Sequence, residues 1–356
     1  MRIAYYHILS SWLSLTTDDR RVFQAFDQDY EAFRKTAPQF QVHLAVSVFQ
    51  KNGGLYLIIN DLNWQIGGPQ ALHCVYHKIL DHLHQQLARQ FFLIHASVVA
   101  RDGQAILIGG PAGAGKSTLT LALTHLGYGF MSDDLAPVDR ITRMVNPFPR
   151  ALWIADPDGH VSHECLRSRK KPLSAVSFGD QQIRTPQQPK VLLWLTCGAA
   201  DPEYEYPEYP GYLALRLTLD PAGEAEILRA LQNVGHLTLT CISPHTWRVL
   251  MANIPGASNK LKSILLTFDS MIWQAYKEQN FKGDFSRPPK ITPCLATDMA
   301  MHLIRELKQA PWQEFQTKSA AAWLMELTCM LSGFSCYELQ VGRLSDTLNL
   351  VRTLIP

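Results

Sequence analysis

The chain lacks an excess of charge of either sign, and it lacks an unbroken apolar segment of membrane-spanning length. Its 356 residues contain 33 Lys and Arg against 31 Asp and Glu, so the net charge is +2. That balance provides no long-range field to attract nucleic acid or an anionic membrane. The most apolar stretch, residues 91–110, is interrupted by His95, Arg101 and Asp102, which argues against a membrane span. We therefore expect no nucleic acid or membrane as a partner, and any bound anion must be held locally.

Cysteine pairs at the spacing of redox or zinc sites are also missing. The seven cysteines are scattered, and no two of them form a Cys-x-x-Cys motif. Two His/Cys clusters lack the partner pair that a zinc site requires. These clusters are His73, Cys74 and His77, and His160, His163 and Cys165. The first 19 residues carry one arginine and no small-residue cleavage site, unlike a signal peptide. We expect a cytoplasmic protein with reduced thiols and no zinc.

What the chain does have is enough apolar sequence for a folded α/β protein. Apolar residues make up 47% of it, which is ample for one large domain or two modest ones. Residues 1–68 predict a small β-rich N-terminal region, with apolar runs at 42–49 and 55–60 around the turn-forming pair Asn52-Gly53. Residues 69–356 form the remainder, starting with an amphipathic helix at 69–90.

Strands and helices alternate along the second region. Apolar runs at 91–100 and 104–110 predict two strands, followed by a glycine-rich loop, a helix at 117–127 and a strand that ends at Asp133. Further strands are predicted at 191–198, 212–219 and 336–342. Helices are predicted at 222–233, around 256–278, 296–308 and 317–331, and at 344–355. Residues 146–190 and 201–212 are rich in proline, which favours loops.

The glycine-rich loop fits the phosphate-binding pattern G-x-x-x-x-G-K-[ST]. It consists of Gly110, Pro111, Ala112, Gly113, Ala114, Gly115, Lys116 and Ser117. Glycines allow positive φ angles and let backbone N–H groups approach phosphate oxygens, and the following helix directs its N-terminus at the same anion. Lys116 is expected to contact the β and γ phosphates, and Ser117 to bind Mg²⁺. An accidental match occurs roughly once in a hundred chains of this length, so the pattern predicts a nucleotide site.

Two further features accompany the loop. Asp133 and Asp134 follow a predicted strand, and because adjacent residues of a strand point in opposite directions, we expect the two carboxylates to act differently. One would reach the Mg²⁺ ion and the other would accept a proton from a hydroxyl. A helix-capping turn is the alternative explanation for this pair. His95, between apolar neighbours, fits either a catalytic group or a hydrogen-bonded core residue.

Together, His95, the loop around Lys116 and the Asp133-Asp134 pair resemble the catalytic domain of HPr kinase/phosphorylase. This bacterial family phosphorylates a serine of a phosphocarrier protein and is related to PEP carboxykinase. The resemblance covers residues 95–139. It implies a P-loop kinase core of that type and the cofactors ATP and Mg²⁺.

The same resemblance implies roles for individual residues. Nucleotide contacts are expected from Gly110 to Thr118, and Mg²⁺ ligation by Ser117 and Asp134. Acid/base chemistry is expected from Asp133, assisted by His95 and Asp134, with the identity of the base left open between the two aspartates.

The rest of the chain departs from that family. The glycine-rich signature after the aspartate pair is missing, and so is the typical N-terminal domain; the turn NPFPR (146–150) and the basic run RSRKKP (167–172) stand there instead. The layout resembles HPr-kinase-related proteins of bacterial gene clusters, some of which phosphorylate ribosomal peptides. The expected acceptor is therefore a hydroxyl of a peptide or protein, at Ser, Thr or a C-terminal residue, or of a small molecule. HPr kinases form rings, so we leave open whether this chain forms a homo-oligomer.

Several cations are candidates for holding the triphosphate or an anionic acceptor. They are Arg150, Arg167, Arg169, Lys170, Lys171 and Arg184. A solvated basic loop explains the run 167–171 equally well.

Three alternatives to a kinase remain. The same site can run in reverse and remove phosphate, as HPr-kinase relatives do. A regulatory or scaffold protein of a modification cluster would bind the nucleotide without transferring phosphate, although such a protein would need no base. A P-loop GTPase is disfavoured because the chain contains no N-K-x-D motif.

Overall fold

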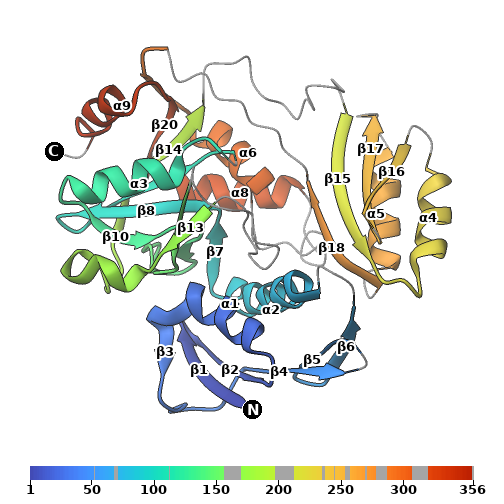
Figure 1. Ribbon diagram of the computed structural model, residues 1–356. Coiled ribbons are helices and arrows are strands. Elements are labelled where there is room, and N and C mark those ends of the chain that lie inside the picture. Colours follow the sequence, from blue (N-terminus) through green and yellow to red (C-terminus); the bar gives the residue numbers. More distant parts are fainter. Residues whose placement is uncertain are drawn as a thin grey trace.

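A computed structural model of the chain describes residues 1–51, 53–67, 71–111, 113–155, 170–196, 212–234, 237–243, 245–252, 257–268, 271–277, 287–306 and 320–354. The fold is mixed α/β and contains both parallel and antiparallel strand pairs. Three larger sheets can be followed in Figure 1: an N-terminal sheet, a central sheet and a third sheet beside α4 and α5. No helix in these ranges combines the length and apolar character needed to cross a membrane.

The N-terminal sheet has six strands in the order β3-β1-β2-β4-β5-β6. The strands are β1 (Arg2–Ile8), β2 (Ser11–Thr17), β3 (Arg34–Lys35), β4 (Leu44–Lys51), β5 (Gly54–Ile59) and β6 (Leu62–Ile66). Only β2 and β4 run parallel. The predicted hairpin is confirmed, because Lys51 pairs with Gly54 across a two-residue turn in which Gly53 has φ +77°.

Two helices share the core of this sheet. The helix α1 (Arg20–Tyr30) was not anticipated by the strand-and-turn prediction for residues 1–68; Asp19 caps it by accepting a hydrogen bond from the backbone N–H of Arg21. The predicted helix at 69–90 is present as α2 (Ala71–Ala88), and its apolar face lies in the same core cluster. A boundary after residue 68, as expected from the sequence, would therefore assign α2 to a different region from the sheet on which it packs.

The central sheet has the order β10-β8-β9-β14-β20-β19. Its strands are β8 (Ala96–Arg101), β9 (Gln104–Gly109), β10 (Gly129–Ser132), β14 (Gln188–Thr196), β19 (Lys290–Pro293) and β20 (Ser335–Gln340). The inner strands β9, β14 and β20 are parallel. Beside this sheet, β7 (Phe91–Ile94) pairs with β11 (Ala136–Asp139).

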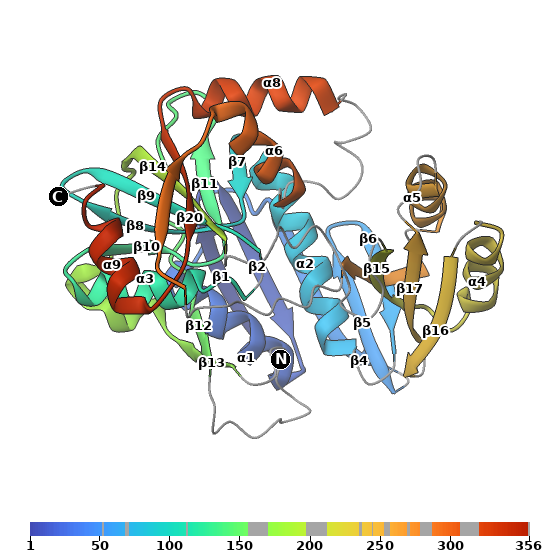
Figure 2. The same cartoon turned by 90° about the horizontal axis from the view of Figure 1, so that it is seen from above.

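Helices cover both faces of the central sheet (Figures 1 and 2). On one face, α3 (Lys116–His125) and α9 (Leu344–Val351) share a core with Ile106 and Ile108 of β9. On the other, α6 (Ala296–Glu306) and α8 (Ala320–Leu331) share a core with Ala105 and Leu107. Alternate residues of a strand point to opposite faces, which explains why β9 is apolar and buried from Ala105 to Gly109.

The third sheet has the antiparallel order β16-β17-β15-β18. Along the chain its elements are β15 (Tyr212–Leu219), α4 (Glu224–Gln232), β16 (Leu237–Ser243), β17 (Thr246–Ala252), α5 (Ala257–Thr267) and β18 (Ile272–Lys277). This β-α-β-β-α-β sequence is the ferredoxin-like arrangement, with a core formed by the sheet and both helices. The prediction of one helical segment over 256–278 is wrong in its second half, because β18 pairs with β15 there.

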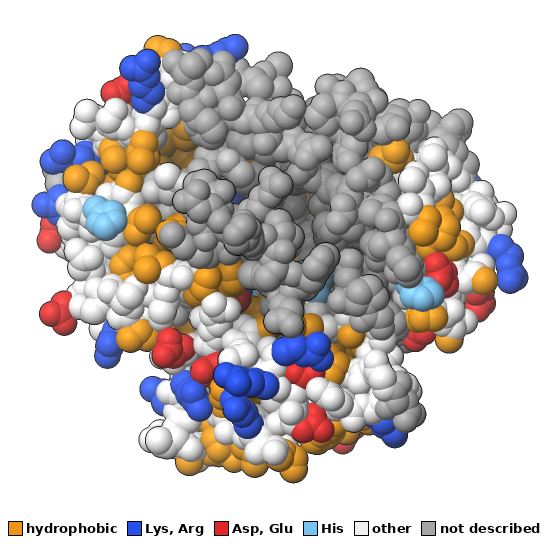
Figure 3. All heavy atoms as spheres, viewed as in Figure 1, with side chains coloured by type: hydrophobic (Ala, Val, Ile, Leu, Met, Phe, Trp, Pro, Cys, Tyr) orange, Lys and Arg blue, Asp and Glu red, His pale blue; other side chains and the backbone are white. Residues whose placement is uncertain are grey.

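The single strand predicted at 91–100 is instead two strands, β7 and β8, which are divided at His95 and pair in different sheets. Other predicted elements occur close to their expected positions. These are α4, β14, β15, α6, α8, β20 and α9. The short elements β12 (Leu152–Ala155), β13 (Lys170–Leu173) and the 3₁₀ segment η2 (Ala175–Gln181) lie in the region predicted as loops with short elements. The predicted loop at 201–212 lies outside the described residues, apart from Tyr212. Over the described part of the face in Figure 3, acidic and basic side chains are interspersed.

Candidate functional site

The glycine-rich loop connects β9 to α3 and has the backbone that the sequence predicts. Gly110, Gly113 and Gly115 have φ angles of +141°, +87° and +94°, a region that side chains with a Cβ rarely adopt. At Gly110 there is also no room, since a Cβ would lie 3.0 Å from both the Cβ atom and the carbonyl oxygen of Leu195. Gly115 is the N-cap of α3, so the loop ends where a helix N-terminus favours an anion. Ala112 lies outside the described residues.

Lys116 starts α3, and its side chain turns back over the loop. The residue is 9% exposed, and Nζ donates hydrogen bonds to the carbonyl oxygens of Gly110 and Pro111 at 2.6 and 3.2 Å. Its ammonium group thus lies against the same loop whose amides are suited to phosphate. Thr118, in the first turn of α3, is exposed.

Asp133 follows the end of β10 and faces the start of α3. It is 3% exposed, and its carboxylate accepts hydrogen bonds from Ser97 Oγ at 2.8 Å and from Ser117 Oγ at 3.0 and 3.2 Å. The backbone N–H of Trp153 also donates to it, at 3.4 Å. The side chain expected to bind Mg²⁺, Ser117, is therefore in contact with Asp133.

Asp134 has different partners. One carboxylate oxygen, Oδ1, lies 2.8 Å from His95 Nε2, and the other, Oδ2, accepts a hydrogen bond from Arg150 Nη1 at 3.2 Å. Its backbone has φ +76°, a conformation that costs a non-glycine residue on the order of 1 kcal/mol and is tolerated best by Asn and Asp. The side chain is 20% exposed. The two carboxylates thus contact separate sets of groups, as expected. Strand alternation is not the reason, because β10 ends at Ser132 and Asp134 has a left-handed backbone.

Arg150 is buried between Asp134 and the N-terminal layer. Its Nη2 atom donates to Asp29 Oδ2 at 2.7 Å and to the hydroxyl of Tyr76 at 3.2 Å. Burial would by itself lower the pKa of Arg150, but Tyr30, Tyr76, Asp29 and Asp134 raise it above the ordinary value. The guanidinium therefore stays charged. Because its Nη1 and Nη2 atoms already bind Asp134 and Asp29, Arg150 is not arranged to bind the phosphates of a nucleotide.

The site also contains residues that the sequence did not single out: Ser97, Asp29, Tyr76 and Trp153. Ser97 could have been found from the sequence, because it lies two positions after His95 in a run predicted as one strand, and alternate residues of a strand share a face. Nothing in the sequence near Asp29 or Tyr76 points to Arg150, which is 121 residues after Asp29.

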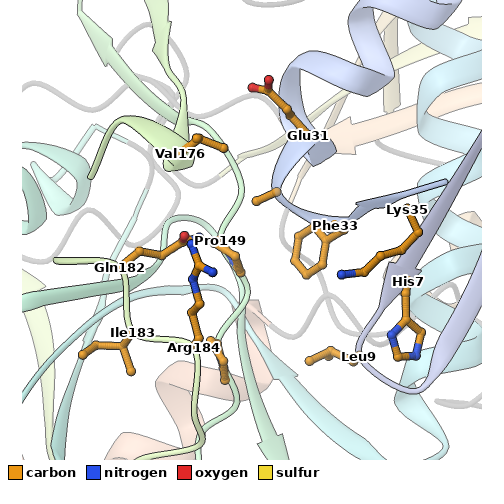
Figure 4. A pocket seen from close by; sticks show the side chains of 12 residues that line it. His7, Leu9, Glu31, Phe33, Lys35, Pro149, Val176, Gln182, Ile183 and Arg184 are labelled. Atoms are coloured by element: carbon orange, nitrogen blue, oxygen red, sulfur yellow. The ribbon is translucent and has the colours of Figure 1, made fainter. Parts of the chain in front are cut away.

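Arg184 lies elsewhere, on a cavity of about 430 Å³ that none of the residues 110–118 lines. Figure 4 shows Arg184 on one side of the cavity and Phe33 and Lys35 on the opposite side. The cavity separates the N-terminal layer from the segment that contains Pro149 and Gln182.

The remaining candidates cannot be joined to the loop. Arg167 and Arg169 lie outside the described residues, as does the cluster His160, His163 and Cys165. Lys170 and Lys171 lie in β13, and only their backbone is described. The rings of His73 and His77 are 4.3 Å apart. Among the residues that the structure describes, no three His, Cys, Asp or Glu side chains are grouped to hold a metal.

Comparison with known proteins adds little to this geometry. No family model matches the chain, and no curated protein matches it. Among solved structures, the Hpr(Ser) kinase/phosphatase from Coxiella burnetii aligns at 18% identity over 50% of this chain and 88% of that chain, with a TM-score of 0.24. That degree of likeness does not establish a shared fold.

Proposed function

We propose that the chain is a Mg²⁺- and ATP-dependent kinase that transfers the γ-phosphoryl group to a hydroxyl of a peptide, a protein or a small molecule. One observation carries the proposal. Beside the glycine-rich loop, Asp133 contacts Ser117 while the next residue, Asp134, contacts His95. Phosphoryl transfer to a hydroxyl requires both a metal-binding oxygen cluster and a separate proton acceptor, whereas a protein that only binds nucleotide requires no acceptor.

The donor set at Ser117 and Asp133 fits Mg²⁺. Both supply oxygen atoms, and Mg²⁺ is commonly held by one or two protein oxygens together with substrate phosphates. The contact favours Asp133 as the metal ligand, which reverses the assignment of Asp134 implied by the resemblance. When bound, the ion would supply charge that offsets the negative charge developing on the phosphates.

Asp134 is then the proposed base. Its side chain is partly exposed, so an acceptor can reach it, and His95 and Arg150 hold one carboxylate oxygen each. The acceptor oxygen forms a bond to the γ-phosphorus, the bond from that phosphorus to the bridging oxygen of ADP breaks, and the hydroxyl proton passes to the Asp134 carboxylate. Lys116 contributes positive charge at the phosphates.

The test is a transfer assay with γ-labelled ATP and a panel of hydroxyl-bearing peptides, proteins and small molecules. Lys116→Ala should abolish transfer and Asp134→Asn should slow it by about 10²–10⁴-fold, with Lys190→Ala, an exposed lysine of β14, as the matched control. Asp134→Asn should still bind Mg-ADP, and Asp133→Asn should need much more Mg²⁺. Transfer by Lys116→Ala at the wild-type rate would disprove the site. Nucleotide binding without transfer to any acceptor would favour the regulatory alternative, and ATP formation from phosphorylated product would reveal the reverse reaction.

A further inference from the structure

The buried ion pair between Asp29 and Arg150 joins the N-terminal layer to the proposed base. Arg150 is 2% exposed and Asp29 is 3% exposed. Ion pairs at such depth are costly to form and are retained only with good geometry and further hydrogen bonds. Here the guanidinium contacts Asp29 with Nη2 at 2.7 Å and Asp134 with Nη1 at 3.2 Å.

Asp29 is itself fixed by groups on every side. Its Oδ1 atom accepts a hydrogen bond from Trp153 Nε1 at 2.7 Å, and its Oδ2 atom accepts one from the Tyr76 hydroxyl as well as from Arg150. Its backbone carbonyl accepts one from the N–H of Ala151. The last turn of α1 is thereby held to the segment that contains Arg150.

Asp134 needs such a restraint. Its left-handed backbone (φ +76°) is held in a sparsely populated conformation, which persists only where the surroundings determine it. A planar guanidinium with two fixed ends defines the direction of the Asp134 carboxylate, which a lysine ammonium on a flexible stem would not do. The Ser117–Asp133 pair is hydrogen-bonded by Ser97 Oγ and by the backbone N–H of Trp153. Trp153 also donates its indole N–H to Asp29 Oδ1, and Asp29→Asn keeps an Oδ1 acceptor for that bond.

We infer that Arg150 is a positioning residue for Asp134 and that Asp29 of α1 holds Arg150 in place. The N-terminal layer thereby contributes to the geometry of the phosphoryl-transfer site. This inference rests on the proposed function in so far as Asp134 is the base. It makes no use of the nucleotide contacts, so its effects are separable from nucleotide binding.

The experiment compares Asp29→Asn with Asp27→Asn. Asp27 lies on the same helix, and its partly exposed carboxylate pairs with Arg34 at 3.1 Å and accepts a hydrogen bond from the Tyr6 hydroxyl at 2.9 Å. It is a matched control because neither partner belongs to the Arg150 network. In Asp29→Asn, kcat should fall at least about tenfold, because small misplacements of a catalytic group have effects of this size or larger, while the KM for ATP and the affinity for Mg-ADP stay within about twofold. Arg150→Lys should retain part of the stability but little of kcat. Asp27→Asn should match wild type.

A double-mutant cycle separates positioning from general destabilisation. If Asp29 acts through Asp134, adding Asp29→Asn to Asp134→Asn should lower the residual rate by less than about twofold. A full multiplicative loss in that background, or unchanged kcat in folded Asp29→Asn, would overturn the inference.

A second readout does not depend on activity. In protein with labelled histidines, the resonance of His95, identified with His95→Gln, should move in Asp29→Asn and stay in place in Asp27→Asn, because His95 contacts Asp134 directly. An unmoved His95 resonance in folded Asp29→Asn also refutes the inference. A wild-type protein that transfers phosphate to no acceptor would instead refute the proposed function, and the His95 resonance would still decide whether Asp29 positions Asp134.

Discussion

Removing the Asp29 carboxylate should destabilise the protein strongly. Asp29→Ala removes the carboxylate that accepts hydrogen bonds from three buried groups: Nη2 of Arg150, Nε1 of Trp153 and the hydroxyl of Tyr76. Nη2 of Arg150 keeps its bond to the Tyr76 hydroxyl. Breaking a buried ion pair on one side costs about 3–5 kcal/mol, and each neutral donor left unpaired costs about 1–3 kcal/mol. These costs overlap, and Arg150 keeps its contact with Asp134. We therefore expect a loss of about 4 kcal/mol in the free energy of unfolding.

The assay is urea unfolding followed by tryptophan fluorescence, with Asp61→Ala as the control because Asp61 is exposed. A cost of this size is a large share of the about 5–15 kcal/mol that stabilises most proteins. Combining Asp29→Ala with Arg150→Met should recover part of the lost unfolding free energy, because the buried Arg150 charge that has lost its Asp29 partner is then removed as well. Equal midpoints for Asp29→Ala and Asp61→Ala, at equal slopes, would refute the account of this network.

Three further predictions concern other parts of the chain. Gly110→Ala should abolish Mg-ADP binding in a calorimetric titration, because its Cβ would lie 3.0 Å from Leu195 at a φ of +141°; affinity at the wild-type level would show that the loop moves freely. Burial raises the pKa of the Cys74 thiol to about 12, so roughly one molecule in ten thousand carries the thiolate at pH 8, and mass spectrometry should show alkylation of exposed Cys241 long before Cys74. Burial alone would raise the pKa of Asp139, but hydrogen bonds led by the Thr142 amide lower it. The stabilisation by the Asp139 carboxylate is therefore present above about pH 4 and is lost as the pH falls through the lowered pKa. In urea unfolding at pH 6 and pH 3, Asp139→Asn should lose less unfolding free energy on acidification than wild type does.

Much of the central sheet was predictable because its elements have strong local patterns. The apolar runs that form β9 and β14 and the helical spacing in α2 appear directly in the sequence. The failures have a common cause. The helix α1 lies in a region whose other patterns favour strands, and β18 follows α5 after a short connection; each is stabilised by packing on sheet strands contributed by other parts of the chain.

At the site, the sequence by itself determined the glycine-rich loop and the residues that follow β10. The positive φ angles of Gly110, Gly113 and Gly115 and the helix that follows them were predictable because both depend on the local sequence. The sequence also predicted separate partners for Asp133 and Asp134, but for a reason that fails: β10 ends at Ser132, so the alternation of strand residues does not apply to this pair.

Only the tertiary structure decided which carboxylate faces Ser117 and which faces His95, and only it brought Asp29 to Arg150 across 121 residues. The physical reason is burial. A charge removed from water must find partners wherever the fold supplies them, and no local pattern in the sequence records which distant element that will be.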